Sequence, residues 1–151
     1  MPVFGKEEHD RDMAVKAAAT QPADLAPFEL PERFDDEDRV GFARGVTAFR
    51  QGDFYLAHDF WEEVWRGYRL RDRLFLQALI HAAVGSYHAE CDNPVGARSQ
   101  FNKAIAKLTP FAPHHWGVDV FELIELVAAA RDQQSGTPEM NDQLRALRET
   151  V

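Results

Sequence analysis

The amino-acid sequence predicts an all-α fold: a compact bundle of about five to six helices built on antiparallel helix hairpins. Apolar residues recur at helical spacing through most of the chain after residue 35, and no stretch shows the alternation of a strand. The breaks between these periodic segments are short, which favours antiparallel neighbours. With 151 residues, of which 45% are hydrophobic, the chain is long enough for one domain with an ordinary core.

Local start and stop signals set the expected helices. Asp35-Asp-Glu-Asp38 is an acidic start, favourable at the positive end of a helix dipole, for a helix over about residues 36–51. Gly52 ends this helix and Asp53 starts the next. The further helices are expected over about residues 53–68, 71–90, 94–108 and 118–133, with a last one opening at Thr137-Pro-Glu139.

Two proline-rich segments interrupt the helical pattern. Residues 1–34 are predicted to be a partly extended N-terminal arm, and residues 35–151 a single helical domain. Residues 109–117 are predicted to be a loop that cannot be helical, anchored by Trp116. The adjacent His114 and His115 in this loop are expected to be structural, because neighbouring histidines rarely chelate one ion alone.

Composition and charge exclude several classes of partner. The net charge of −8 argues against a nucleic-acid or anionic-membrane partner, and no apolar run approaches the roughly 18 residues of a membrane span. The first residues do not resemble a signal peptide, and the single Cys91 cannot form an internal disulfide, so the expected location is the cytoplasm. Only 4 of the 17 basic residues are lysine. This acidic, lysine-poor balance suits a salt-rich cytoplasm, or else an arginine-rich genome.

Residues 53–66 are the most informative segment. They place His58 and Glu62 one helical turn apart, between Trp61 and Trp65. Polar groups on an aromatic helix face form either a buried structural network or a site. The sequence favours the network, because a buried carboxylate needs a partner and such networks fix helix packing.

The following helix carries the expected partners of this pair. In an antiparallel hairpin, His58 and Glu62 would face Gln77 and His81. His88 would lie nearby, and Arg73 would lie near the edge of the cluster.

Three other interpretations of the cluster remain open. As a metal site, its candidate ligands are His58, Glu62, His81 and His88. As an acid/base site, its candidate catalytic residues are Glu62 and His58, with His58 or His81 as the partner of Glu62. As a ligand-binding site, its candidate residues are Arg73, Gln77, Trp61 and Trp65.

The pattern resembles the DUF309 family of small helical proteins of unknown function over about residues 38–128. The motifs that carry the resemblance are Gly52-Asp-Phe-Tyr-Leu-Ala-His58, Trp61-Glu62-x-x-Trp65-Arg66, Arg73-x-Phe75-Leu-Gln77-Ala-Leu-Ile80, Tyr87-His88, Asn93-Pro-x-Gly96-Ala97, Pro110-Phe-Ala-Pro113 and Gly117-Val-Asp119. The resemblance implies a compact α-helical bundle and no particular activity. His81 departs from the family pattern, which often has glutamine there, and glutamine is a poor metal ligand.

The sequence therefore favours a binding or scaffold protein with a buried His58–Glu62 network, requiring no cofactor. A homodimer or an unidentified protein partner is the expected assembly. The alternative is a hydrolase-type enzyme, dependent on a transition metal or on acid/base catalysis, that uses the same cluster.

Overall fold

The structure, a computed structural model, describes residues 28–133. In this part of the chain the helices are α2 (Asp36–Arg50), α3 (Phe54–Gly67), α4 (Arg73–Glu90), α5 (Pro94–Leu108) and α6 (Val120–Asp132). The predicted all-α fold is confirmed, and each of these helices begins and ends close to its predicted bounds. The helix expected from Thr137 and most of the expected N-terminal arm lie outside the described residues.

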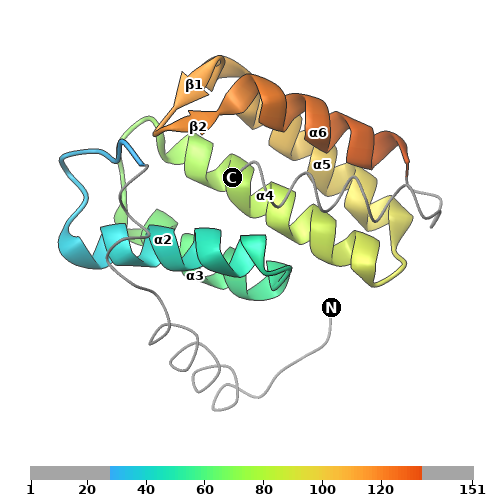
Figure 1. The fold of residues 1–151 in the computed structure, drawn as a ribbon, viewed down its shortest axis with the longest axis horizontal. Coiled ribbons are helices and arrows are strands. Elements are labelled where there is room, and N and C mark those ends of the chain that lie inside the picture. The colour runs from blue at the N-terminus through green and yellow to red at the C-terminus, as the bar shows by residue number, and fades with distance from the viewer. Residues whose placement is uncertain (1–27, 134–151) are drawn as a thin grey trace, which may run out of the picture.

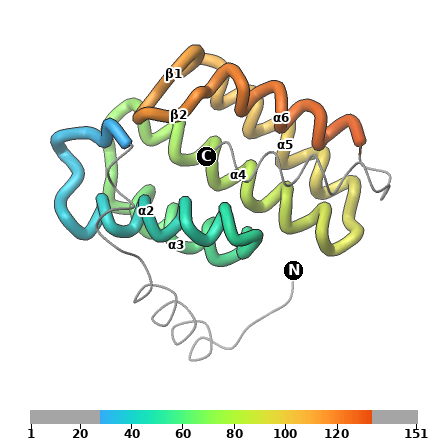
Figure 2. Tube along the Cα trace, viewed as in Figure 1, coloured from blue at the N-terminus to red at the C-terminus, as the bar shows by residue number. Residues whose placement is uncertain are grey.

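Each helix packs on its neighbours in sequence and runs in the opposite direction to them (Figure 1). In the trace of Figure 2, α2 and α3 form a hairpin on one side of α4, and α5 and α6 lie on the other side. Helix α4 therefore has partners on two sides, and Phe75, Leu76 and Leu79 on it are completely buried. This central position decides the environment of its polar residues.

The helix ends follow from local chemistry. The side chain of Asp35 accepts a hydrogen bond from the backbone N–H of Asp38 at 2.7 Å, and the Asp38 side chain accepts one from the backbone N–H of Asp35 at 3.3 Å. Gly52 has φ of 83°, which glycine adopts without strain, and this turns the chain sharply from α2 into α3. The sharp turn fixes α2 against α3.

The segment between α5 and α6 corrects two predictions. Thr109–Phe111 form a short 3-10 helix, and His114–His115 pair with Val118–Asp119 as the antiparallel strands β1 and β2. The turn between the strands has positive φ at both central residues, 52° at Trp116 and 80° at Gly117, which suits the twist of a tight hairpin. The predictions of a wholly non-helical loop and of no strand are therefore wrong here.

Trp116 anchors this hairpin in the core, as predicted. Its ring lies 5.3 Å from that of Phe34, 5.7 Å from Phe42 and 5.2 Å from Phe75, measured between centroids. The backbone N–H of Glu29 also donates to the carbonyl of Trp116 at 3.3 Å. The hairpin thus joins the start of the described chain to α2 and α4.

Among the described residues, no helix is both long enough and apolar enough to cross a membrane.

Candidate functional site

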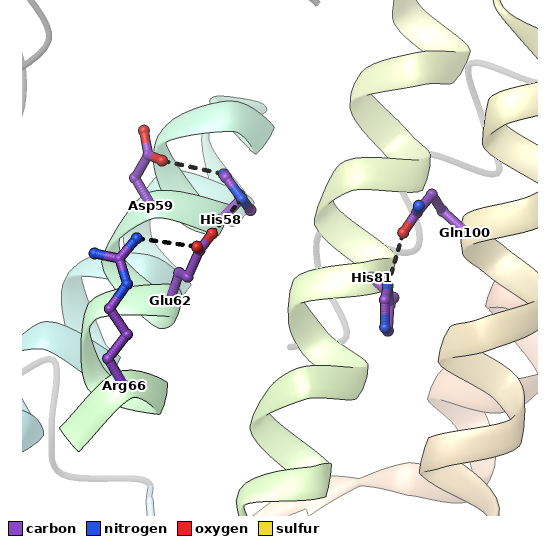
Figure 3. A network of polar contacts seen from close by, with 6 residues as sticks. All are labelled: His58, Asp59, Glu62, Arg66, His81 and Gln100. Atoms are coloured by element: carbon purple, nitrogen blue, oxygen red, sulfur yellow. Dashed lines mark hydrogen bonds and ion pairs between the residues drawn. The ribbon is translucent and has the colours of Figure 1, made fainter. Parts of the chain in front are cut away.

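His58 lies between two carboxylates of its own helix (Figure 3). Its Nε2 is 2.6 Å from a carboxylate oxygen of Glu62, one turn further along α3, and its Nδ1 is 3.1 Å from an oxygen of Asp59. Glu62 also accepts a hydrogen bond from the guanidinium of Arg66 at 3.1 Å. The predicted contact of His58 with Glu62 is therefore present, within a four-residue chain of charges on one helix.

The His58 pair is less buried than a core network would be. The His58 side chain is 16% exposed and that of Glu62 is 33% exposed. Burial alone lowers the pKa of His58, but the hydrogen bond and charge of Asp59, with the charge of Glu62, outweigh it and raise that pKa above its usual 6.5. The arrangement favours an imidazolium held between two carboxylates.

Asp59 is the second carboxylate beside His58. Its side chain is half-buried beside His58. Asp59 lies about 100° round the helix from His58, but the His58 ring reaches both carboxylates because each of its nitrogens lies near a different one.

Trp61, a candidate binding residue, is completely buried. Its indole Nε1 donates to the backbone carbonyl of Phe42 on α2 at 3.1 Å. Its ring packs 5.6 Å from Phe49, centroid to centroid. The environment of Trp61 is therefore that of a core residue joining α2 to α3.

Trp65 and Arg73 form a separate contact between the end of α3 and the start of α4. The guanidinium carbon of Arg73 lies 4.1 Å from the centroid of the Trp65 ring, and its Nη2 donates to the Trp65 carbonyl at 3.3 Å. Both side chains are half-buried, and within residues 28–133 the buried indole Nε1 and guanidinium Nε have no hydrogen-bond acceptor. Arg73 thus fixes the α3–α4 connection rather than reaching Glu62.

The prediction that His81 faces His58 and Glu62 is wrong. Its Nδ1 is 2.7 Å from Oε1 of Gln100, and its Nε2 is 2.9 Å from Nζ of Lys107. Both partners belong to α5, and Figure 3 shows His81 directed from α4 away from α3. The physical reason is the central position of α4, since α5 competes with α3 for the polar side chains of this helix.

His88 and Gln77 do not complete the predicted cluster either. His88 lies in the last turn of α4, and its Nδ1 lies 3.2 Å from the side-chain nitrogen of Asn93, the residue that caps α5. Gln77 is half-buried on α4. Within residues 28–133, no group of three or more histidine, cysteine, aspartate or glutamate side chains is arranged to hold a metal ion. The four candidate ligands are therefore not assembled into one metal site.

A second polar cluster, centred on Asp72, was not predicted. One Asp72 carboxylate oxygen accepts a hydrogen bond from the Tyr68 hydroxyl at 2.5 Å, and the other accepts one from Nε1 of Trp116 at 3.1 Å. The Nε2 of His115 lies 3.5 Å from Asp72. Burial, the hydrogen bond to Asp72 and its charge raise the pKa of the Tyr68 hydroxyl above its usual 10.0, so Tyr68 keeps its proton and donates it. No sequence signal joins Asp72 to Trp116, 44 residues away.

Tyr68 and Asp72 form one wall of a pocket of about 770 Å³ at the end of the bundle, which we call the Leu74 pocket. Its lining is mainly apolar, and Leu70 and Leu74 within it are 40% and 44% exposed. The residues that line it are Pro31, Glu32, Arg33, Tyr68, Leu70, Arg71, Asp72, Leu74, Pro110 and Phe111. The pocket therefore combines segments before α2, around the start of α4 and after α5.

Comparison with known proteins agrees with the motif pattern. A search among curated proteins gives no match. Residues 42–100, which hold α3, α4 and parts of α2 and α5, match the family described as Domain of unknown function (DUF309). The His58 chain of charges, Arg73 and His81 lie inside the matched residues, whereas the Trp116 hairpin lies outside them. The predicted resemblance is thus confirmed as a match to the DUF309 family over residues 42–100.

Proposed function

We propose that this protein is a binding protein whose ligand is a small, mostly apolar molecule held in the Leu74 pocket. In this proposal the His58–Glu62 pair is structural and stabilises α3. The single observation that carries the proposal is the pocket itself, in which exposed leucines meet a polar wall of fixed geometry.

The size and lining of the Leu74 pocket support binding. Its volume of about 770 Å³ falls within the range of small-molecule sites, which are mostly apolar with a few placed polar groups. Leu70 and Leu74 are large apolar side chains that remain exposed there. Covering them with an apolar ligand would remove their surface from water, at about 25 cal/mol per Å².

The polar wall supports selectivity within the same pocket. Asp72 accepts hydrogen bonds from both Trp116 and Tyr68, so its position is set before a ligand arrives. Arg33 and Arg71 add two guanidinium groups to the lining, each able to donate several hydrogen bonds. A pre-positioned group such as Asp72 fixes ligand orientation at low entropic cost.

The geometry of His58 supports a structural role over catalysis. A general base needs a nitrogen directed at the substrate, and a metal ligand needs a free lone pair. Both ring nitrogens of His58 instead lie within 3.1 Å of carboxylates on the same helix. The alternative of a metal-dependent or acid/base enzyme using His58, Glu62, His81 and His88 loses support because His81 bonds to α5 instead.

Titration with the fluorescent dye anilinonaphthalene sulfonate tests the proposal. The full chain should bind it saturably at one site, and Leu74→Glu should abolish this binding because it introduces a charge into the apolar wall. The matched control is Phe121→Glu on α6, where the side chain is 60% exposed and outside the pocket. Equal loss in the two variants, or unchanged binding in Leu74→Glu, would reject the pocket as the binding site.

The same variants test the predicted homodimer. Light scattering over a series of protein concentrations measures the mass in solution of the parent, Leu74→Glu and Phe121→Glu. A dimer lost only in Phe121→Glu would place the contact between copies on α6 and leave the pocket free for its ligand.

A further inference from the structure

Lys107, His81 and Gln100 form a linear chain of hydrogen-bonding side chains between α4 and α5. The Nζ of Lys107 is 2.9 Å from Nε2 of His81, and Nδ1 of His81 is 2.7 Å from Oε1 of Gln100 (Figure 3 shows the His81–Gln100 end). All three residues are half-buried. These three side chains lie outside the Leu74 pocket and play no part in the ligand binding proposed there.

The donors and acceptors in this chain fix the tautomer of His81. A lysine ammonium can only donate, so Nε2 of His81 must accept and carry no hydrogen. The hydrogen therefore sits on Nδ1, where the Gln100 carbonyl oxygen accepts it. A neutral imidazole with its lone pair aimed at Lys107 is the result.

The surroundings lower the pKa of both groups, which makes the neutral form of each easier to reach. Burial lowers the pKa of His81 below its usual 6.5, and the charges of Lys107 and Lys103 lower it further, against the opposing hydrogen bond that His81 donates to Gln100. Burial, and then the charge of Lys103, lower the pKa of Lys107 below its usual 10.5. A neutral lysine amine is a nucleophile, whereas an ammonium is not.

The arrangement has the three parts of an activated nucleophile: an amine, a base within hydrogen-bond reach of it, and a third group that orients the base. We propose that Lys107 is a reactive amine that condenses reversibly with small anionic carbonyl compounds, such as aldehydes or 2-oxo acids that carry a carboxylate. His81 serves as the base, and Gln100 is a positioning residue that acts through His81.

The step balances without any further reactant. The Lys107 ammonium gives one proton to Nε2 of His81, and the freed lone pair attacks the carbonyl carbon to form the C–N bond. The carbonyl oxygen becomes a hydroxyl by taking a proton from the attacking nitrogen. His81 then returns its proton to that hydroxyl, which leaves as water while the protonated C=N bond forms. Nothing is oxidised or reduced, and His81 ends neutral as it began.

Lys103 indicates the charge of the carbonyl compound. It lies one helical turn before Lys107 on α5, and its side chain is exposed. Two neighbouring ammonium positions on an otherwise acidic protein attract a carboxylate. The imine carbon would bond to Lys107 while the carboxylate lies near Lys103.

The test is reductive trapping of the full chain with glyoxylate and cyanoborohydride, followed by peptide mass spectrometry. The chain has 4 lysines, Lys6, Lys16, Lys103 and Lys107, so each site is resolved separately. Lys103 is the internal control because it shares the helix and is more exposed. We expect Lys107 to be labelled about tenfold faster than Lys103 or more. Equal rates at the two lysines would overturn the proposal.

Variants show whether the reactivity of Lys107 depends on His81 as a base or only on the exposure of Lys107 to solvent. His81→Gln keeps groups able to hydrogen-bond Lys107 and Gln100 but takes up no proton, so labelling of Lys107 should slow by about 10²-fold while that of Lys103 is unchanged. Gln100→Ala should slow the labelling of Lys107 less than His81→Gln does, since the base remains but loses its orientation. If a thermal melt shows that His81→Gln is unfolded, the labelling rate of Lys107 in Gln100→Ala alone tests the role of His81. A rate for Lys107 that is unchanged in Gln100→Ala and in any folded His81→Gln overturns the role of His81.

The choice of carbonyl compound has its own test. Acetaldehyde replaces glyoxylate in the same assay, and Lys103→Gln removes the neighbouring charge. The preference of Lys107 for glyoxylate over acetaldehyde should fall in Lys103→Gln. An equal preference in parent and variant would overturn the anionic class of substrate.

Discussion

Gly45 of α2 packs directly against the indole ring of Trp61 of α3. A methyl group added at Gly45 would lie 2.1 Å from Nε1 and 2.3 Å from Cδ1 of that ring. The same Nε1 donates to the Phe42 carbonyl on α2. The distance between the two helices is therefore set by the missing side chain at residue 45, and it places α3, with His58 on it, relative to the core.

The first prediction follows from this contact. Gly45→Ala should lower the free energy of unfolding by about 2–3 kcal/mol, because the completely buried Trp61 has no space to move and would lose its bond to Phe42. Urea denaturation measures the change. The matched control is Gly67→Ala at the end of α3, where an added methyl group meets no atom within 4 Å. Helix propensity alone should make that variant more stable by up to about 1 kcal/mol. A neutral Gly45→Ala would contradict the contact.

The second prediction concerns the pH dependence that His58 contributes. Its folded pKa is raised above the 6.5 of the unfolded chain, so the stabilisation is fully present below that value and is lost as the pH rises through the folded pKa. The difference in unfolding free energy between the parent and His58→Gln should therefore be largest in acid, at about 1 kcal/mol for so exposed a pair. Chemical denaturation from about pH 5 to about pH 9 measures it.

Two variants identify the charges responsible for this pH dependence. Asp59→Asn and Glu62→Gln should each remove part of it, because each carboxylate contacts one nitrogen of His58. Arg66→Gln should leave it nearly unchanged, because Arg66 is exposed and pairs with Glu62 rather than with His58. A pH dependence that survives loss of both carboxylates would mean that His58 is not their partner.

The third prediction concerns Asp72. Asp72→Asn leaves one oxygen to accept from Tyr68 and Trp116 together, so one of the two donors loses its acceptor, at a cost of about 1–3 kcal/mol. The raised pKa of Tyr68 should also move back toward its usual 10.0, since the charge of Asp72 contributes to it. Tyrosinate absorbance in an alkaline titration measures this shift, and Trp116 fluorescence reports the change around the indole. An unaltered tyrosinate curve would contradict the hydrogen bond.

The sequence predicts the helices well because their signals are local. Asp35, Gly52 and Asn93 act within one turn of the helix ends they define. The His58–Glu62 contact was predictable for the same reason, since residues four apart on one helix lie side by side.

Contacts between helices were less predictable. Helical spacing places His81 on a half-buried face of α4, but it does not say whether α3 or α5 covers that face. The partner that His81 contacts on α5, Gln100, lies 19 residues away in the sequence. The Asp72–Trp116 bond spans 44 residues, and it depends on a hairpin in which tryptophan takes a positive φ that few residues favour. Only the assembled core brings such groups together.

The last prediction concerns salt. At a net charge of −8, repulsion among surface carboxylates opposes folding, and molar salt shortens the screening length from about 10 Å to about 3 Å. The melting temperature should therefore rise between about 0.1 M and about 1 M KCl, if the acidic surface is adapted to salt. Screening also weakens attractive pairs such as Glu62–Arg66, but the 25 acidic residues outnumber the 17 basic ones.

A double variant is the control for this salt effect. Glu63→Gln with Glu125→Gln removes two exposed negative charges from α3 and α6, so its melting temperature should rise less over the same KCl series. Scanning calorimetry of both proteins gives the two slopes. A parent whose melting temperature stays flat or falls would reject salt adaptation and leave the acidic, arginine-rich composition as a property of the genome.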